Sequence, residues 1–337
     1  MIGAAPRTPK QLAADLLDRA SVRVVEMSGV VARIVVELPP LGEAASSLTA
    51  APVALRGTID GPHCQYASTL TANVALRAPV GHAYVPGESR RVTLEAAIPD
   101  PCFWTPQLPH WYRVKLELAR DNNVLARTER WLGLRPLSVR ARGLHFDGAG
   151  WVLRAVHQAL LPGAELPQWR EESLAMIVAS PDDELCEAAS QIGVLLVAEL
   201  NGSAKHIIAE LQRLSRHAAV GLAIVTSTEP LDASVRHVAG GIIHVQRIDN
   251  PDANAGLPSS AGIDVELPWR QALLVDASDL ALVERVATGS SLPVLIERTA
   301  TGCATLAAAR RACDTLQADT AGHGAIAGYL IRAVAAR

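Results

Sequence analysis

Residues 174–226 read LAMIVASPDDELCEAASQIGVLLVAELNGSAKHIIAELQRLSRHAAVGLAIVT. Within them three short apolar runs, LAMIVA, GVLLVAE and VGLAIVT, alternate with two segments that have a helical pattern. Runs that are apolar at nearly every position, rather than at every second one, are typical of parallel strands buried on both faces of a sheet. Pro181 and Asp182 are expected to open the first helix. The stretch therefore predicts consecutive βα units.

The same alternation extends in both directions from this stretch. The strand candidates are WVLRAVH (151–157), LAMIVA (174–179), GVLLVAE (193–199), VGLAIVT (220–226), GIIHVQ (241–246), ALLVDA (272–277), LPVLIE (292–297) and AIAGYLI (325–331). Eight strands predict a small, reduced (β/α)8 TIM-like barrel with some helices short or missing. Residues 249–270 show no helix pattern, and Ser278 is a candidate N-cap. An open doubly wound sheet is the alternative, although no GxGxxG or P-loop follows any strand.

The first part of the chain has a different pattern. Residues 21–140 hold seven short, β-branched and often alternating runs, separated by breaks rich in Gly, Pro and Asp. This pattern predicts an antiparallel immunoglobulin-like β-sandwich. Residues 1–20 resemble a short amphipathic helix. We therefore expect a multi-domain β plus α/β protein: an extension (1–20), the sandwich (21–140) and the barrel (144–337).

Composition excludes several classes of function. The chain has 337 residues, 49% of them apolar, and a formal net charge of −3. It lacks the basic footprint of a nucleic-acid-binding protein, an apolar run of the ~18 residues that a membrane helix needs, and the apolar core of a signal peptide. The five cysteines and ten histidines show no metal-binding spacing. We therefore predict a cytoplasmic protein without a metal, cofactor, membrane or nucleic-acid partner. Five free thiols are expected, and a Cys64–Cys102 disulfide within the first domain is the alternative.

The joint between the two predicted domains carries a resemblance. Residues 101–112 read PCFWTPQLPHWY, and a predicted hairpin and LHFDGAGWVLRAVHQ follow. This order resembles glycoside hydrolase family 2, the β-galactosidase, β-glucuronidase and β-mannosidase family, in which an immunoglobulin-like domain leads into a barrel. The matching residues are Trp104, Pro106, Pro109, Tyr112, Gly133, Leu134, Arg135, Asp147, Gly148, Leu153, Arg154 and Val156. Residues 184–199 give a second, weaker match. Trp104, Trp111 and Trp131 are expected to pack where the domains meet.

The resemblance implies two catalytic carboxyl groups, one after barrel strand four and one at strand seven. A retaining glycosidase holds such groups about 5–5.5 Å apart. Glu229 follows strand four and would be the acid/base, although Thr228 stands where the family has Asn. Glu297 would be the nucleophile, but it falls one residue short of the family's spacing. Since one residue reverses side-chain direction in a strand, Glu297 is expected to face the helices or to pair with Arg298 or Arg332.

Other polar residues end barrel strands and are candidates to bind a substrate at the barrel mouth. They are His157, Glu199, Asn201, Asp249 and Asp276. Each is also a common type of cap or turn residue. The family's strand-two arginine is missing, and aromatic residues make up only 4% of the chain.

These observations leave three hypotheses. The first is a catalytically degenerate relative of family 2 that acts as a carbohydrate-binding or scaffold protein, with a sugar or a protein as its partner. The alternative is an active retaining glycosidase with Glu229 as acid/base and Glu297 as nucleophile. A third is an unrelated α/β binding module, which fewer than eight barrel strands would support. The sequence does not predict an oligomeric state.

Overall fold

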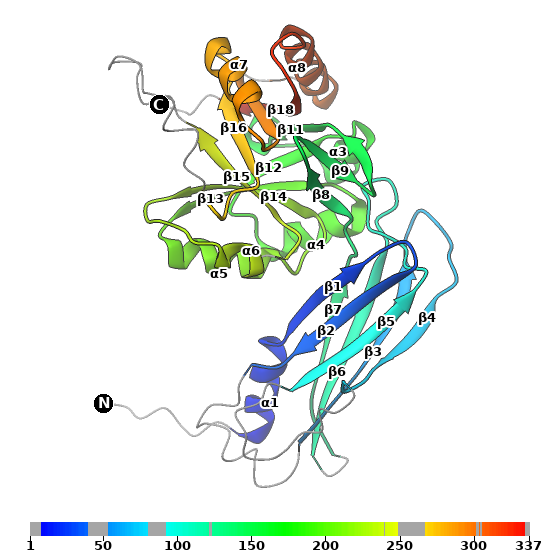
Figure 1. Cartoon of the computed structure of the whole chain (residues 1–337). Coiled ribbons are helices and arrows are strands. Elements are labelled where there is room, and N and C mark those ends of the chain that lie inside the picture. Colours follow the sequence, from blue (N-terminus) through cyan, green and yellow to red (C-terminus); the bar gives the residue numbers. More distant parts are fainter. Residues whose placement is uncertain are drawn as a thin grey trace. The chain divides into compact units, whose positions relative to one another are not determined.

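The computed structural model describes residues 8–39, 53–79, 92–120, 123–238, 240–248, 267–300, 303 and 305–333. The chain divides into two compact units, shown in Figure 1. The first unit consists of Met1–Phe103 and His110–Leu134, and the second of Trp104–Pro109 and Arg135–Arg337.

The first unit is built from two antiparallel sheets. One has the strand order β1 (Ser21–Met27), β2 (Val31–Glu37), β5 (Thr93–Pro99), and the other β4 (Ala72–Leu76), β3 (Val53–His63), β6 (Trp111–Arg120), β7 (Asn123–Leu132). Both sheets contribute to one apolar core, with Ile34 and Leu94 from the first and Ile59 and Leu116 from the second. The predicted β-sandwich is therefore confirmed.

One helix in the described part of this unit, α1 (Pro9–Asp18), packs its apolar face onto this core. Thr8 and Gln11 form a capping box at its start, and Leu16 and Leu17 are buried. The Arg130 guanidinium on β7 donates to the carbonyl oxygens of Leu17 and Ala20 at its other end. A cation is favourable there because the last carbonyl groups of a helix have no partner within the helix.

The second unit begins with a small antiparallel sheet and continues as a closed barrel of eight parallel strands. The small sheet consists of β8 (Leu137–Arg140), β9 (Gly143–Phe146) and β10 (Ala149–Trp151). The barrel strands are β11 (Leu153–His157), β12 (Ala175–Ala179), β13 (Leu196–Gly202), β14 (Val220–Ser227), β15 (Ile243–Ile248), β16 (Ala272–Asp276), β17 (Val294–Ala300) and β18 (Ile326–Ala333). β18 pairs with β11 and closes the barrel, so the open sheet is excluded.

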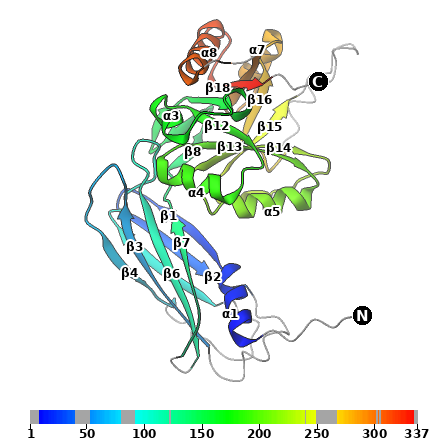
Figure 2. The same ribbon diagram turned by 180° about the vertical axis from the view of Figure 1, so that it is seen from behind.

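Helices cover the outside of the barrel and are reduced in places. They are η2 (Gln158–Leu160), α3 (Leu166–Glu171), α4 (Asp183–Ile192), α5 (Ala204–Leu214), α6 (Ser234–Val238), α7 (Leu280–Gly289) and α8 (Leu306–Asp319). Figure 2 shows α4 and α5 along one flank and α7 and α8 along the opposite one. The predicted small TIM-like barrel is thus confirmed. Among the described residues, no helix is long and apolar enough to cross a membrane.

The helix starts follow capping chemistry. Asp182 accepts a hydrogen bond from the Leu185 amide at 2.8 Å and caps α4, as the sequence predicts. The prediction of Ser278 as a cap is wrong, because Asp279 caps α7 by accepting from the Leu282 amide at 2.9 Å. Ser278 instead donates its amide to the Asp276 carboxylate at 2.8 Å.

The residues behind the family resemblance hold the second unit together. Trp104 is fully buried, and its Nε1 donates to the Ser190 carbonyl oxygen at 2.8 Å. Arg135 donates to the carbonyl oxygens of Ala218 and Gly241, and burial lowers its pKa to about 10. Gly193 has φ +91°, and a Cβ there would lie 2.4 Å from the Pro106 carbonyl oxygen. These contacts explain why such residues specify the architecture.

Candidate functional site

Polar side chains from five barrel strands meet inside the barrel, and we call them the interior ring. They are His157 on β11, Glu199 on β13, Arg247 on β15, Glu297 on β17 and Arg332 on β18. Ion pairs between strands that are not neighbours can form only across the interior. Four of the strands are the first, third, fifth and seventh, which is how side-chain layers are built in such barrels.

The carboxylates of Glu199 and Glu297 are buried and form ion pairs with the same two arginines. The Glu199 carboxylate lies 3.0 Å from Arg332 Nη2 and 3.5 Å from Arg247 Nη2. Glu297 accepts a hydrogen bond from Arg247 Nη1 and lies 3.7 Å from Arg332 Nη1. Each guanidinium therefore bridges both carboxylates. The side chains of Glu199 and Glu297 are 9% and 7% exposed, whereas that of Arg332 is 29% exposed, so this arginine is nearer to solvent.

The ring keeps the Glu199 carboxylate ionised. Burial alone would raise the pKa of Glu199, but a hydrogen bond from His157 and the charges of Arg332, His157 and Arg247 outweigh it, and the pKa is lowered. The His157 Nε2 atom lies 3.4 Å from the Glu199 carboxylate. The two carboxylates and the two guanidiniums of the ring carry equal and opposite formal charge. An ionised carboxylate in such surroundings is a poor general acid at neutral pH.

The alternation of side chains along β17 shows which way Glu297 points. The Arg298 guanidinium donates to the Asp319 carboxylate on α8 at 2.8 Å, which places Arg298 on the helix side of the strand. Successive side chains of a strand point to opposite faces, so Glu297 faces the interior. The expectation that it faces the helices or pairs with Arg298 is wrong, while the pairing with Arg332 is confirmed as an ion pair.

Glu229 lies in an exposed loop after β14 and is used differently. Its Oε2 accepts a hydrogen bond from the amide of Ala204, the first residue of α5, at 3.1 Å. A carboxylate at a helix N-terminus satisfies an unpaired amide and interacts favourably with the helix dipole. Among the described residues, no hydrogen bond or ion pair joins Glu229 to Glu297. The carboxylate that shares partners with Glu297 is Glu199.

The remaining candidates lie at the strand ends. Asn201 follows Glu199 by two residues on β13, and is therefore on the same face, and it is exposed. Asp276 is also exposed and accepts from the Ser278 amide in a turn. Asp249 lies outside the described residues. The structure thus brings together His157, Glu199 and Glu297, and their roles in binding or catalysis stay predictions.

Sequence reasoning missed Arg247. It occurs in GIIHVQRI, directly after the predicted strand, and the pattern does not reveal it because the pattern marks strand ends and not contacts across a barrel. The one available signal is periodicity: Ile243, Val245 and Arg247 alternate with residues of the outer face, which places a charge on the same face as buried apolar residues.

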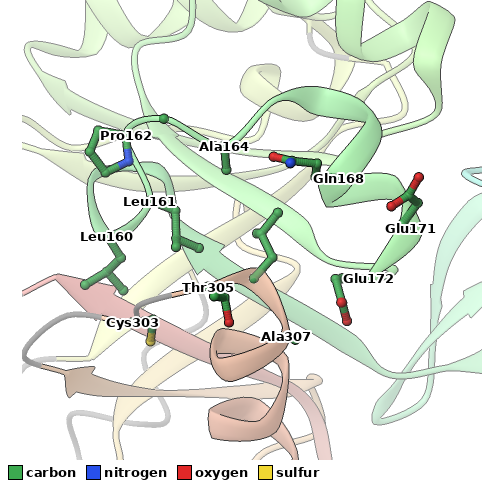
Figure 3. A pocket seen from close by; sticks show the side chains of 12 residues that line it. Leu160, Leu161, Pro162, Ala164, Gln168, Glu171, Glu172, Cys303, Thr305 and Ala307 are labelled. Carbon is green, nitrogen blue, oxygen red and sulfur yellow. The ribbon is translucent and has the colours of Figure 1, made fainter.

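A separate cavity of about 520 Å³ lies beside the barrel opening and is shown in Figure 3. It lies between the segment that follows β11 and the start of α8, and none of the interior ring residues lines it. Its walls are formed by Leu160, Leu161, Pro162, Gly163, Ala164, Gln168, Glu171, Glu172, Cys303, Thr305, Leu306 and Ala307. No group of three or more His, Cys, Asp or Glu suited to a metal occurs among the described residues, and all five cysteines are unpaired.

Solved structures of other proteins have a similar architecture. Crystal structures of a glycosyl hydrolase family 2 member from Bacteroides cellulosilyticus and of Bacteroides uniformis β-glucuronidase each cover 93% of the chain at 14% identity, with TM-scores of 0.65 and 0.63. B. uniformis β-glucuronidase 2, covalently bound to cyclophellitol-6-carboxylate aziridine, covers 93% at 13% identity with a TM-score of 0.57. This chain has the fold of the family 2 glycosidases.

The likeness to family 2 is one of fold, because the identities are low. No protein-family model and no curated protein matches the sequence. The chain spans about half the length of the solved family 2 structures that it matches, 45% in each of the three cases above. The family 2 fold explains the Trp104 and Arg135 contacts. It does not by itself carry an activity, because function depends on the site.

Proposed function

We propose that this chain is a catalytically degenerate relative of the family 2 glycosidases that acts by binding, as a carbohydrate-binding or scaffold protein. One observation carries the proposal: Glu297, the candidate nucleophile, is buried and ion-paired with Arg247 and Arg332. The candidate acid/base, Glu229, is used at the start of α5.

The chemistry of retaining hydrolysis needs an arrangement of a different kind. One carboxylate attacks the sugar while a second, protonated carboxyl group about 5–5.5 Å away delivers a proton to the leaving group. In the interior ring, the carboxyl group that shares arginines with Glu297 is Glu199, and its lowered pKa keeps it ionised. An ionised Glu199 has no proton to deliver to the leaving group.

The ion pairs also oppose attack by Glu297. Removing one partner of a buried ion pair costs about 3–5 kcal/mol, and each ~1.4 kcal/mol added to a barrier slows a reaction about tenfold. A nucleophile that must first give up its contact with Arg247 would therefore be slower by roughly two to four orders of magnitude.

Hydrolysis of chromogenic sugars tests the proposal. The full chain is incubated with 4-nitrophenyl β-glucuronide, β-galactoside and β-mannoside, alongside Glu297→Gln and Glu229→Gln. We expect all three proteins to release nitrophenol at the rate of buffer alone. Turnover by the wild type that both substitutions abolish would overturn the proposal.

The second candidate function, an active retaining glycosidase, is favoured by one specific feature. Glu297 points into the barrel from the seventh strand, and its Oε2 is buried and accepts no hydrogen bond from the described residues. That oxygen is the atom that would attack a sugar. The same assay separates the two functions, since only this candidate makes turnover depend on both Glu297 and Glu229.

A further inference from the structure

The outer face of the four-stranded sheet in the first unit carries a cluster of aromatic and polar side chains. We call it the tryptophan patch and define it as Asp60, His63, Trp111, Arg113 and Trp131. The rings of His63 and Trp111 lie 4.3 Å apart between centroids, and those of Trp111 and Trp131 lie 3.9 Å apart and nearly perpendicular. Arg113 Cζ lies 5.8 Å from the centre of the Trp131 ring.

The sandwich core does not explain the patch. On β6, Tyr112 and Val114 point into the core and are buried, and alternation along the strand places Trp111 and Arg113 on the opposite face. Trp131 is paired with Arg113 in the sheet register and is 43% exposed. The sequence predicts that Trp131 packs where the two domains meet, and this stays a prediction. A large aromatic ring left partly in water, on a rigid strand, is typical of a binding surface.

Polar groups stand in register beside the indole rings. Asp60 on β3 is directly opposite Arg113, and exposed Asn73 on β4 is directly opposite Asp60. The Asp60 carboxylate lies 3.2 Å from His63 Nε2 and 4.0 Å from Arg113 Nε. This Nε atom is buried and has no hydrogen-bond partner among the described residues. One row therefore runs across all four strands, from an amide through a carboxylate and a guanidinium to an indole.

This combination matches the chemistry of a sugar. A pyranose ring has an apolar C–H face and a rim of hydroxyl groups that donate and accept hydrogen bonds. Binding sites for such molecules combine aromatic surface with a few placed polar groups. Asp60 and Arg113 offset each other's charge, so the patch favours a neutral ligand over an acidic one.

A protein partner fits less well. A stable protein interface buries about 800 Å² on each side, whereas only three rings form the apolar part of this patch. Three rings are suited to one or two sugar units. We propose that the tryptophan patch binds a neutral carbohydrate, with Trp131 against the C–H face and Asp60 and Arg113 at the hydroxyl groups. This inference rests on the proposed role as a binding protein and locates the ligand outside the barrel.

Titration of the full chain with β-linked hexasaccharides of glucose, galactose and mannose, and with hexagalacturonate, tests the inference by calorimetry. We expect at least one neutral hexasaccharide to bind, and Trp131→Ala to weaken that binding by about tenfold or more, as for a central aromatic contact. Val25→Ala is the matched control, because Val25 is 54% exposed on the other sheet of the same unit. It should leave binding unchanged.

Two other outcomes of the titration overturn the inference. Binding that Trp131→Ala retains would locate the sugar elsewhere, and would leave the proposed binding role intact. No binding of any neutral hexasaccharide would overturn the inference, and self-association in sedimentation velocity that Trp131→Ala abolishes would then identify the patch as a protein interface. Turnover of nitrophenyl glycosides would contradict the proposed function without bearing on the patch.

Discussion

Replacing Arg247 by methionine tests how much the ion pairs of the interior ring contribute to the stability of the protein. The change keeps an unbranched side chain but removes a guanidinium whose side chain is 19% exposed. Glu297 would keep only Arg332, at 3.7 Å, while remaining buried. Breaking one partner of a buried pair costs about 3–5 kcal/mol of the free energy of unfolding. Glu199 keeps its closer partner, Arg332 at 3.0 Å, so its carboxylate is destabilised less than that of Glu297. We therefore expect the free energy of unfolding of Arg247→Met to be lower by about 3 kcal/mol.

A double-mutant cycle separates the pair from the other effects. Arg247→Met, Glu297→Leu and the double variant are unfolded in urea and followed by circular dichroism at 222 nm. That signal reports mainly the barrel, because α1 is the one helix in the described part of the first unit. Since an apolar pair often replaces a buried ion pair at little cost, we expect the double variant within about 1 kcal/mol of the wild type. The reasoning would be refuted if the decreases in the free energy of unfolding of the two single variants added up in the double variant. It would also be refuted if Arg247→Met lowered the free energy of unfolding by less than about 1 kcal/mol.

Three further predictions concern the rest of the second unit. Burial, together with the Arg236 charge, lowers the pKa of His244 to about 4. Below about pH 6.5 this histidine is therefore protonated in the unfolded chain but stays neutral in the folded chain until about pH 4. The free energy of unfolding should consequently be about 2 kcal/mol lower at pH 5 than at pH 7. Urea unfolding of His244→Leu at pH 7 and pH 5 should show this pH dependence reduced, and an unchanged dependence would contradict it. Gly193→Ala should lower the free energy of unfolding by more than about 1 kcal/mol, because Gly193 has φ +91° and a Cβ there would clash with the Pro106 carbonyl oxygen. Thermal denaturation measures this. Gly163→Ala is the control, since a Cβ at Gly163 would meet nothing within 4 Å. Glu229→Gln should lower the free energy of unfolding by only about 0.3–1 kcal/mol, the value of a charge at a helix N-terminus. A larger decrease in the same urea assay would mean that the contact with α5 is not the main role of Glu229.

The fold could be predicted because its signals are local. Apolar runs such as LAMIVA and VGLAIVT mark strands buried on both faces, and they recur eight times. The joint residues add to this, since Trp104 and Arg135 make buried contacts that depend on their exact chemistry. Local capping was less certain, because Ser278 and Asp279 are adjacent and both are residues that cap helices.

The site could be predicted only in part, because it depends on contacts between distant strands. The polar residues ERTA after LPVLI resemble a loop, so Glu297 was expected to end its strand. They pair with β18 instead, and β17 runs to Ala300, which makes Glu297 a mid-strand residue that faces the interior. Arg247 and Glu199 are 48 residues apart in sequence. Barrel closure brings them together, and periodicity within one strand cannot show that.

Covalent labelling tests the central claim most directly. Cyclophellitol-6-carboxylate aziridine is found covalently bound to B. uniformis β-glucuronidase 2, and such a reagent needs a carboxylate that is free to attack. The chain is incubated with this compound and with the gluco-, galacto- and manno-configured aziridines, and intact mass is measured. We predict an unmodified mass, because Glu297 is held by Arg247 and Arg332. An adduct that maps to Glu297 and disappears in Glu297→Gln would contradict the account.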